Sequence, residues 1–91
     1  MDVERLKAAA QRAVGTNQTA KAISRGQARV VFVAQDADRR VTEPLLRSAR
    51  EQGVDVVEVP SMAALGRACG IAVGAAAAAI LESPKETDRP G

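Results

Sequence analysis

Histidine, tryptophan and tyrosine are absent from this 91-residue chain, and cysteine and phenylalanine occur once each. Without histidine there is no imidazole base and no Ser-His-Asp triad. The single cysteine, Cys69, can neither chelate a metal by itself nor form an internal disulfide, and we interpret it as a small buried hydrophobic residue. The lack of aromatic residues also removes the stacking platforms that most proteins use to read single-stranded RNA. If the chain binds RNA, we therefore expect it to read a folded RNA.

The size and composition predict one globular domain. Hydrophobic residues make up 46% of the chain and charged residues 26%, which is typical of a soluble protein. No signal pattern is visible, and the longest apolar run, over 71–81, is too short to span a bilayer, so we expect a cytoplasmic protein. The net charge of +2 permits binding to nucleic acid without requiring it. Five cations lie near one polar stretch, namely Lys21, Arg25, Arg29, Arg39 and Arg40.

That polar stretch runs from Gly15 to Lys21, between two apolar patterns of helical period. If Thr16 caps a helix, the side chains of Asn17, Gln18 and Lys21 share one face. The N–H groups of a first helical turn have no partner inside the helix and carry a partial positive charge, which suits phosphates and carbonyl oxygens. Asn and Lys side chains can also reach base edges. The stretch is typical of a helix that reads nucleic acid, or of an ordinary helix start with polar residues on its wet side.

The apolar periods along the chain alternate between helix and strand. They predict helices over 3–13, 17–24, 43–51 and 62–69, and strands over 14–15, 30–34, 55–59 and 74–81. The last segment is ambiguous, because five consecutive alanines favour a helix whereas the alternation of elements favours a strand, and we expect a strand. This order predicts a three-layer α/β/α sandwich with a small mixed four-stranded sheet, forming one domain over 1–82. The polar segment 83–91 is expected to be a disordered tail.

Several hydroxyl residues stand where helices are expected to begin. These predicted caps are Thr16, Thr42 and Ser61. On the helix over 17–24 we expect Ala20 and Ile23 to be buried. Asp36 and Asp38 follow the strand over 30–34, but the surrounding residues do not meet the calcium-loop pattern. We therefore expect loop and capping roles for these two carboxylates, and no metal site.

Several separated motifs occur in a fixed order along the chain. They are the segment 15–23, Arg25-Gly26, the segment 33–38, Val59-Pro60-Ser61 and the segment 65–71. Together they resemble the kink-turn-binding ribosomal-protein family, which includes an archaeal large-subunit protein shared with box C/D guide ribonucleoproteins and short bacterial proteins of the YbxF type. In length the chain looks most like the bacterial branch.

The resemblance implies a mode of RNA recognition. Family members insert the start of their second helix into the widened major groove of a kink-turn, an internal loop with tandem sheared G·A pairs. On that precedent Asn17 and Lys21 would contact guanine acceptor atoms, and Gln18 would face a guanine Watson–Crick or amino edge. Backbone amides near Gly15 and Thr16 would meet phosphates.

The resemblance also assigns roles outside this helix. Asp38 would contact RNA or steady the nearby basic residues. An apolar ledge under an extruded nucleotide would be formed by Ile71, Ala72 and Val73. Two positions depart from the family: Gln18 stands where many relatives have Glu, and Met62 where some have a basic residue. The first departure weakens or alters recognition on the scale of one bidentate contact, about 1–3 kcal/mol.

These observations favour a non-enzymatic RNA-binding protein that recognises kink-turn RNA, in a ribosome or a structured leader. We expect a monomer without cofactor, metal or membrane partner. An alternative is a protein-interaction or ribosome-assembly module that keeps the fold but has lost specific RNA reading, and Gln18 and the mild net charge support it. A third hypothesis is a small enzyme. No acid/base or nucleophile constellation can be assembled from the sequence, however, and a phosphate-binding catalytic loop needs more glycine than Gly15 alone.

Overall fold

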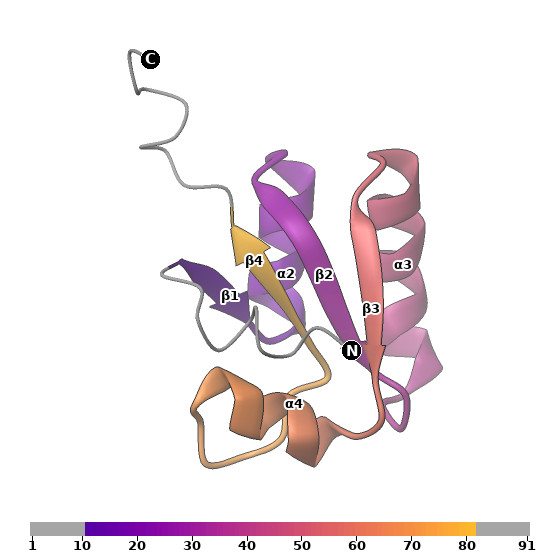
Figure 1. The fold of residues 1–91 in the computed structure, drawn as a ribbon. Coiled ribbons are helices and arrows are strands. Elements are labelled where there is room, and N and C mark those ends of the chain that lie inside the picture. The colour runs from indigo at the N-terminus through magenta and orange to yellow at the C-terminus, as the bar shows by residue number, and fades with distance from the viewer. Residues whose placement is uncertain (1–10, 82–91) are drawn as a thin grey trace.

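The computed structural model describes residues 11–81. Its elements, in chain order, are β1 (Arg12–Val14), α2 (Thr16–Ser24), β2 (Ala28–Ala34), α3 (Arg39–Glu51), β3 (Asp55–Val59), α4 (Met62–Cys69) and β4 (Ala77–Leu81). The strands form a single sheet in the order β1-β4-β2-β3 (Figure 1). β2 and β3 run parallel, whereas β4 runs antiparallel to both of its neighbours, β1 and β2. The predicted mixed four-stranded sheet is therefore confirmed.

Helices cover both faces of this sheet. Because side chains alternate along a strand, β2 supplies residues to two cores. Val31 and Val33 pack with residues of α2 and α3, including Ile23 and Leu45. On the other face, Phe32 packs against α4 in a second cluster. In Figure 1, α2 and α3 lie together behind the sheet, as the layers of the predicted α/β/α sandwich require.

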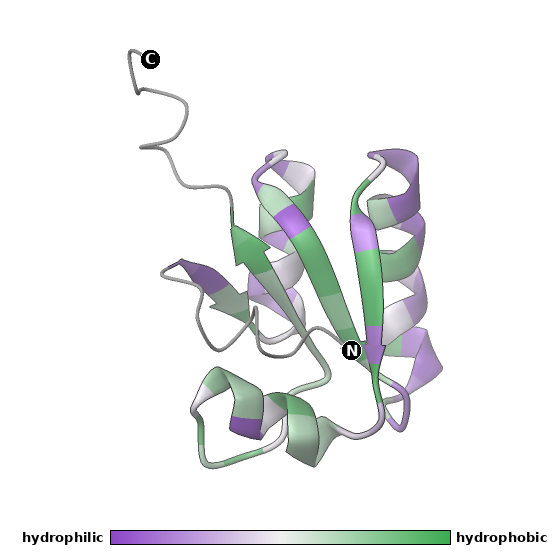
Figure 2. Cartoon of the chain, viewed as in Figure 1, coloured by the Kyte–Doolittle hydropathy of each residue, from purple (hydrophilic) through white to green (hydrophobic). Residues whose placement is uncertain are grey.

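The inner strand β4 is built mainly from alanine. Ala77, Ala78 and Ala79 are completely buried, and β4 is hydrogen-bonded on both edges, to β1 and to β2. Figure 2 shows that hydrophobic residues follow β2 and β4, whereas much of α3 is hydrophilic. Short side chains in the middle strand allow the helices on both faces to approach it closely. The sequence predicted a strand here, but it begins at Ala77, later than expected.

The end predicted for the first helix, at residue 13, is too late, because β1 has already begun at Arg12. Arg12 and Ala13, expected at its end, belong to β1, where they pair with Ile80 and Ala79 of β4. Partners far along the chain thus override a local helical pattern. The earlier part of that predicted helix, and the predicted tail over 83–91, lie outside the described residues.

The start of α2 also differs from the prediction. Thr16 is the first residue of the helix, and the N-cap is Gly15, whose φ of 98° suits glycine and which offers no side-chain cap. The buried face is formed by Thr19, Ala22 and Ile23. Ala20, predicted to be buried, is exposed. Thr19 takes the buried position one residue earlier, at helical spacing from Ala22 and Ile23.

α3 begins four residues before the predicted start. Its N-cap is Asp38, and a carboxylate oxygen of Asp38 accepts a hydrogen bond from the backbone N–H of Arg40 at 2.9 Å. Thr42, the predicted cap, lies inside the helix with its side chain buried. Pro44 also lies inside the helix. Asp38, at the end of the turn after β2, thus caps α3 four residues before Thr42.

Among the remaining elements, β2 begins at Ala28, two residues before the predicted start, whereas the other boundaries agree with the sequence patterns. β3 and α4 have the predicted bounds. The Oγ atom of Ser61 caps α4 by accepting a hydrogen bond from the N–H of Ala64 at 3.0 Å, and Gly70 ends that helix in the left-handed conformation. α2 ends at Ser24, as predicted.

Candidate functional site

The first turn of α2 presents free backbone donors. The N–H of Gly15 donates to the carbonyl oxygen of Ala77 at 2.9 Å, and its own carbonyl accepts the first helical hydrogen bond, from Thr19, at 3.0 Å. Within residues 11–81, no acceptor is found for the N–H groups of Thr16, Asn17 and Gln18. Because no side chain caps this turn, its donors and the positive end of the helix dipole remain available to an anion or a carbonyl group.

Three polar side chains lie on the same part of α2 as these donors. Asn17, Gln18 and Lys21 are all exposed. Their side chains make no hydrogen bond or ion pair with the rest of the described chain, 11–81. The opposite face of α2 packs on the sheet and on α3. The structure therefore places the amide and ammonium groups on one solvent-facing side of the helix start.

The loop between α4 and β4 is apolar and exposed. The side chain of Val73 is 69% exposed and that of Ile71 37%, and Ala72 between them is also exposed. The loop is tied to α4, because the N–H of Ile71 donates to the carbonyl oxygen of Gly66 at 3.1 Å. Gly66 was not assigned a role from the sequence, although a glycine inside a helical pattern indicates close packing. These aliphatic side chains form a fixed ledge.

This ledge and the start of α2 lie at the same end of the sheet. β4 runs antiparallel to β2, so it begins where β2 ends, and the ledge immediately precedes it. The hydrogen bond from Gly15 to Ala77, the first residue of β4, fixes the start of α2 beside the same strand. In Figure 1 this is the end of the sheet at which α4 lies. The topology thus brings together two predicted site segments that are far apart in sequence.

Asp38 lies at this end too, but its carboxylate is already engaged. Besides capping α3, it accepts hydrogen bonds from the guanidinium of Arg40, through Nε at 3.3 Å and Nη2 at 3.0 Å. These hydrogen bonds hold the pKa of Asp38 below its ordinary value of 3.8. The Arg40 side chain remains 90% exposed. Asp38 therefore pairs with a basic side chain, and its role in RNA binding stays a prediction.

The cations near the polar stretch separate into two groups in space. Arg39 and Arg40 begin α3, directly after β2, and so lie at the end of the sheet that carries the ledge. Arg25 follows the end of α2 and Arg29 lies near the start of β2, at the opposite end. Arg39 and Arg40 were not among the predicted site residues. A position just after a turn that follows a buried strand is the signal that could have indicated them.

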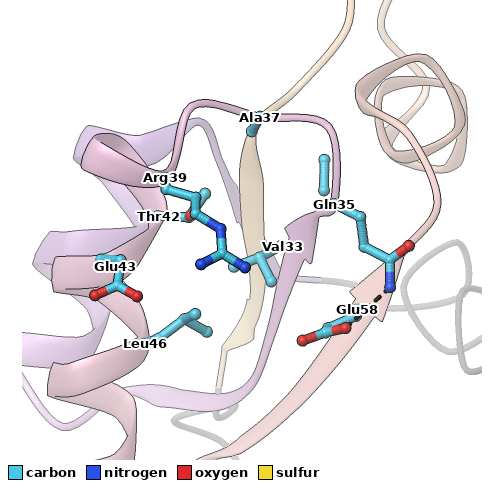
Figure 3. Close-up of a pocket in the computed structure, with 9 residues that line it drawn as sticks. Val33, Gln35, Ala37, Arg39, Thr42, Glu43, Leu46 and Glu58 are labelled. Carbon is cyan, nitrogen blue, oxygen red and sulfur yellow. Dashed lines mark hydrogen bonds between the residues drawn. The ribbon is translucent and has the colours of Figure 1, made fainter.

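An open cleft of about 250 Å³ lies beside the start of α3. Figure 3 shows the Arg39 side chain between Glu43 of α3 and Glu58 of β3, with Val33 and Leu46 among the lining residues. Glu58 accepts a hydrogen bond from the Gln35 side chain at 2.9 Å. The cleft contains neither a thiol nor an imidazole. No group of three potential metal ligands occurs anywhere within the described part of the chain.

The two remaining predictions from side-chain chemistry are confirmed. Cys69 is buried, and burial raises the pKa of its thiol, with an opposing effect of the Arg12 charge. Asp36 has the predicted capping role, because its carboxylate accepts a hydrogen bond from the N–H of Met62, the first residue of α4, at 2.8 Å. Over residues 11–81, no helix has the length and apolarity needed to cross a membrane.

Comparison with known proteins places this geometry in a family. Residues 2–88 match the model of the "Ribosomal protein L7Ae/L30e/S12e/Gadd45 family". The chain is 46% identical over 81 residues to the "RNA-binding protein YbxF" of Geobacillus stearothermophilus, covering 89% of this chain and 99% of that protein. It is 44% identical over 75 residues to the "Large ribosomal subunit protein eL8" of Halobacterium salinarum (strain ATCC 29341 / DSM 671 / R1), covering 81% of this chain and 62% of that one.

A solved structure agrees with the sequence relatives. The "Giardia lamblia 15.5kD RNA binding protein" superposes with a TM-score of 0.79 at 30% identity, over 94% of this chain and 72% of that one. The predicted resemblance to this ribosomal-protein family is thereby confirmed. The protein belongs to the ribosomal protein L7Ae/L30e/S12e/Gadd45 family.

Proposed function

We propose that this protein binds RNA without catalysing a reaction, and that it recognises kink-turns through the start of α2. The observation that carries the proposal is the juxtaposition, at one end of the sheet, of three free N–H groups, three exposed polar side chains and an aliphatic ledge. Relatives that match over most of this chain are named RNA-binding proteins. Recognition of a sharply bent RNA needs donors and a shaped surface, and it does not need aromatic rings.

Each group has a distinct task in this proposal. The free N–H groups after Gly15 meet phosphate oxygens, where the helix dipole adds to their attraction. Asn17 and Lys21 donate to guanine acceptor atoms in the widened groove, and Gln18 faces a guanine edge. The ledge over 71–73 supports an extruded nucleotide by apolar contact, and Arg40, held by Asp38, faces the RNA as a cation.

The names of the relatives support an RNA partner. We place the protein in the cytoplasm as a monomer, with ribosomal RNA or another kink-turn RNA as its partner and without cofactor or metal. The alternative of a protein-interaction or assembly module remains supported by Gln18, whose side chain has one acceptor oxygen where a carboxylate has two. It predicts no preference for kink-turn RNA.

The test is a titration of the full chain with a kink-turn hairpin and with the same stem lacking its G·A pairs. We expect wild type to prefer the kink-turn. Asn17→Ala and Lys21→Ala each weaken binding by about 1–3 kcal/mol. Lys21→Ala also reduces the salt dependence of binding if its ammonium displaces a counterion from the RNA. The midpoint of thermal unfolding stays nearly constant, because both side chains are exposed.

Matched controls lie in the short segment between the end of α2 and the start of β2. Arg25→Ala removes a cation and Gln27→Ala an amide, both exposed and both away from the ledge. These two variants are expected to bind like wild type. Equal affinity of wild type for the two RNAs would support the assembly module, and equal losses in all four variants would contradict a site at the start of α2.

A further inference from the structure

Met62, the first residue of α4, lies between two hydrogen bonds that join three separate segments. Its N–H donates to the carboxylate of Asp36, in the turn after β2, at 2.8 Å. Its carbonyl oxygen accepts a hydrogen bond from the N–H of Ala75, just before β4, at 3.0 Å. One residue thus connects the turn at the end of β2 to the segment that carries the ledge over 71–73.

Close packing makes the ledge move together with α4. A Cβ atom on Gly74 would lie 3.1 Å from the Cβ of Met62, and one on Gly66 would overlap the carbonyl oxygen of Val73. Gly66 therefore lets the backbone of the loop lie directly on α4, and Gly74 lies close to the Cβ and the backbone of Met62. Packing this tight leaves little room for the loop to shift relative to α4, so a displacement of α4 is passed to the ledge.

The far end of the loop is fixed to different elements. The N–H of Ala34 in β2 donates to the carbonyl oxygen of Ala76 at 2.9 Å, and the N–H of Gly15 donates to that of Ala77 at 2.9 Å. The start of α2 is consequently fixed to the sheet, whereas the ledge is fixed to α4. The distance between the two depends on how α4 is held against the end of the sheet.

We propose that Asp36 is a positioning residue for RNA recognition, which holds α4, and through Met62 the ledge, at the spacing from the start of α2 that the RNA requires. This inference rests on the proposed function. Asp36 acts through the backbone of Met62 and need not touch RNA. Ser61 caps the same helix at Ala64 but does not connect α4 to the turn after β2. The two caps therefore have different consequences, although both stabilise α4.

The experiment compares Asp36→Ala, Asp36→Asn and Ser61→Ala in the full chain, using the kink-turn hairpin. Asp36→Ala and Ser61→Ala each remove one cap of α4 and are expected to lower the midpoint of thermal unfolding by similar amounts. Asp36→Ala alone weakens RNA binding, by roughly tenfold, on the scale of a lost hydrogen bond to a charged group. Asp36→Asn keeps an acceptor oxygen and restores binding to within about twofold. Amide hydrogen exchange at Ala75 rises in Asp36→Ala and stays near the wild-type rate in the other two variants.

Failure of this inference can be told apart from failure of the proposed function. If wild type does not prefer the kink-turn, the proposed function is wrong and the RNA role of Asp36 fails with it. If wild type does prefer the kink-turn, but Asp36→Ala binds it with the same affinity as Ser61→Ala, only the positioning role is overturned. A loss of binding in Asp36→Ala without faster exchange at Ala75 would likewise contradict an action through Met62.

Discussion

The carbonyl oxygen of Val73 occupies the place where a side chain on Gly66 would begin. Gly66 is buried in the middle of α4, where glycine costs about 0.5–1 kcal/mol relative to alanine. Packing thus overrides helix propensity at this position. The benefit is an exposed ledge that lies directly on the helix.

Gly66→Ala is expected to lower the free energy of unfolding by about 1–3 kcal/mol, because the loop must move away from the added methyl group. Helix propensity alone predicts the opposite sign. Ala63→Gly, at an exposed position of the same helix, measures the propensity term and should cost about 1 kcal/mol. Urea denaturation checks both variants. A stabilised Gly66→Ala protein would show that the loop accommodates the methyl group without cost.

Thr19→Val is expected to stabilise the protein by about 1 kcal/mol. The Thr19 side chain is completely buried, and its hydroxyl oxygen has no hydrogen-bond partner in the described structure, residues 11–81. A buried polar group without a partner costs about 1–3 kcal/mol, and valine has nearly the same shape and helix propensity. Thr42→Val is the control, because Thr42 borders the open cleft, where water can reach it. No gain in Thr19→Val by urea denaturation would mean that the hydroxyl is satisfied in solution.

The raised pKa of the buried Cys69 thiol leads us to expect that the protein loses stability in alkaline solution. Burial raises its pKa in the folded protein above the ordinary value of 9.0, so the unfolded chain releases this proton at a lower pH than the folded one. The contribution of this thiol to the free energy of unfolding is constant below pH 9.0 and falls as the pH rises above that value. Urea denaturation of wild type and Cys69→Ala between pH 7 and pH 10 should show a difference that shrinks at the alkaline end. A constant difference would contradict the raised pKa.

Gln18→Glu is expected to tighten kink-turn binding by about 1–3 kcal/mol, because a carboxylate can accept two hydrogen bonds from one guanine. Binding to the stem without G·A pairs should not improve, since the added negative charge repels phosphate. Gln27→Glu introduces the same charge away from the ledge and should bind both RNAs slightly more weakly. Titration at a fixed salt concentration checks all three proteins. Weaker kink-turn binding by Gln18→Glu would place this side chain away from a guanine edge.

Elements with strong local signals were predicted correctly. β3 lies between a glycine turn and Pro60, and α4 between the Ser61 cap and Gly70, so both ends of each element are marked in the sequence. The predicted starts of α2 and α3 were wrong because two possible capping residues lie close together at each start. Thr16 and Thr42 are good capping residues, but Gly15 and Asp38 precede them and take the role.

The exposure of the candidate site residues could be predicted from the sequence, whereas the proximity of the two site segments could not. Exposure of Asn17, Gln18 and Lys21 follows from helical spacing, and exposure of the ledge follows from its place after a helix stop. Their proximity depends on the pairing of β4 with β1 and β2, which joins residues that are far apart in sequence. The same pairing placed Arg12 and Ala13 in a strand. No local pattern contains that information.

β4 is the last of the described elements to leave the ribosome during synthesis, yet it lies between β1 and β2 in the finished sheet. Until it emerges, β1 has no neighbouring strand and Gly15 lacks the Ala77 carbonyl that fixes the beginning of α2. Closing this long-range pairing is the slow kind of folding step. The start of α2 can therefore reach its final position only after β4 has been synthesised and has paired with β1.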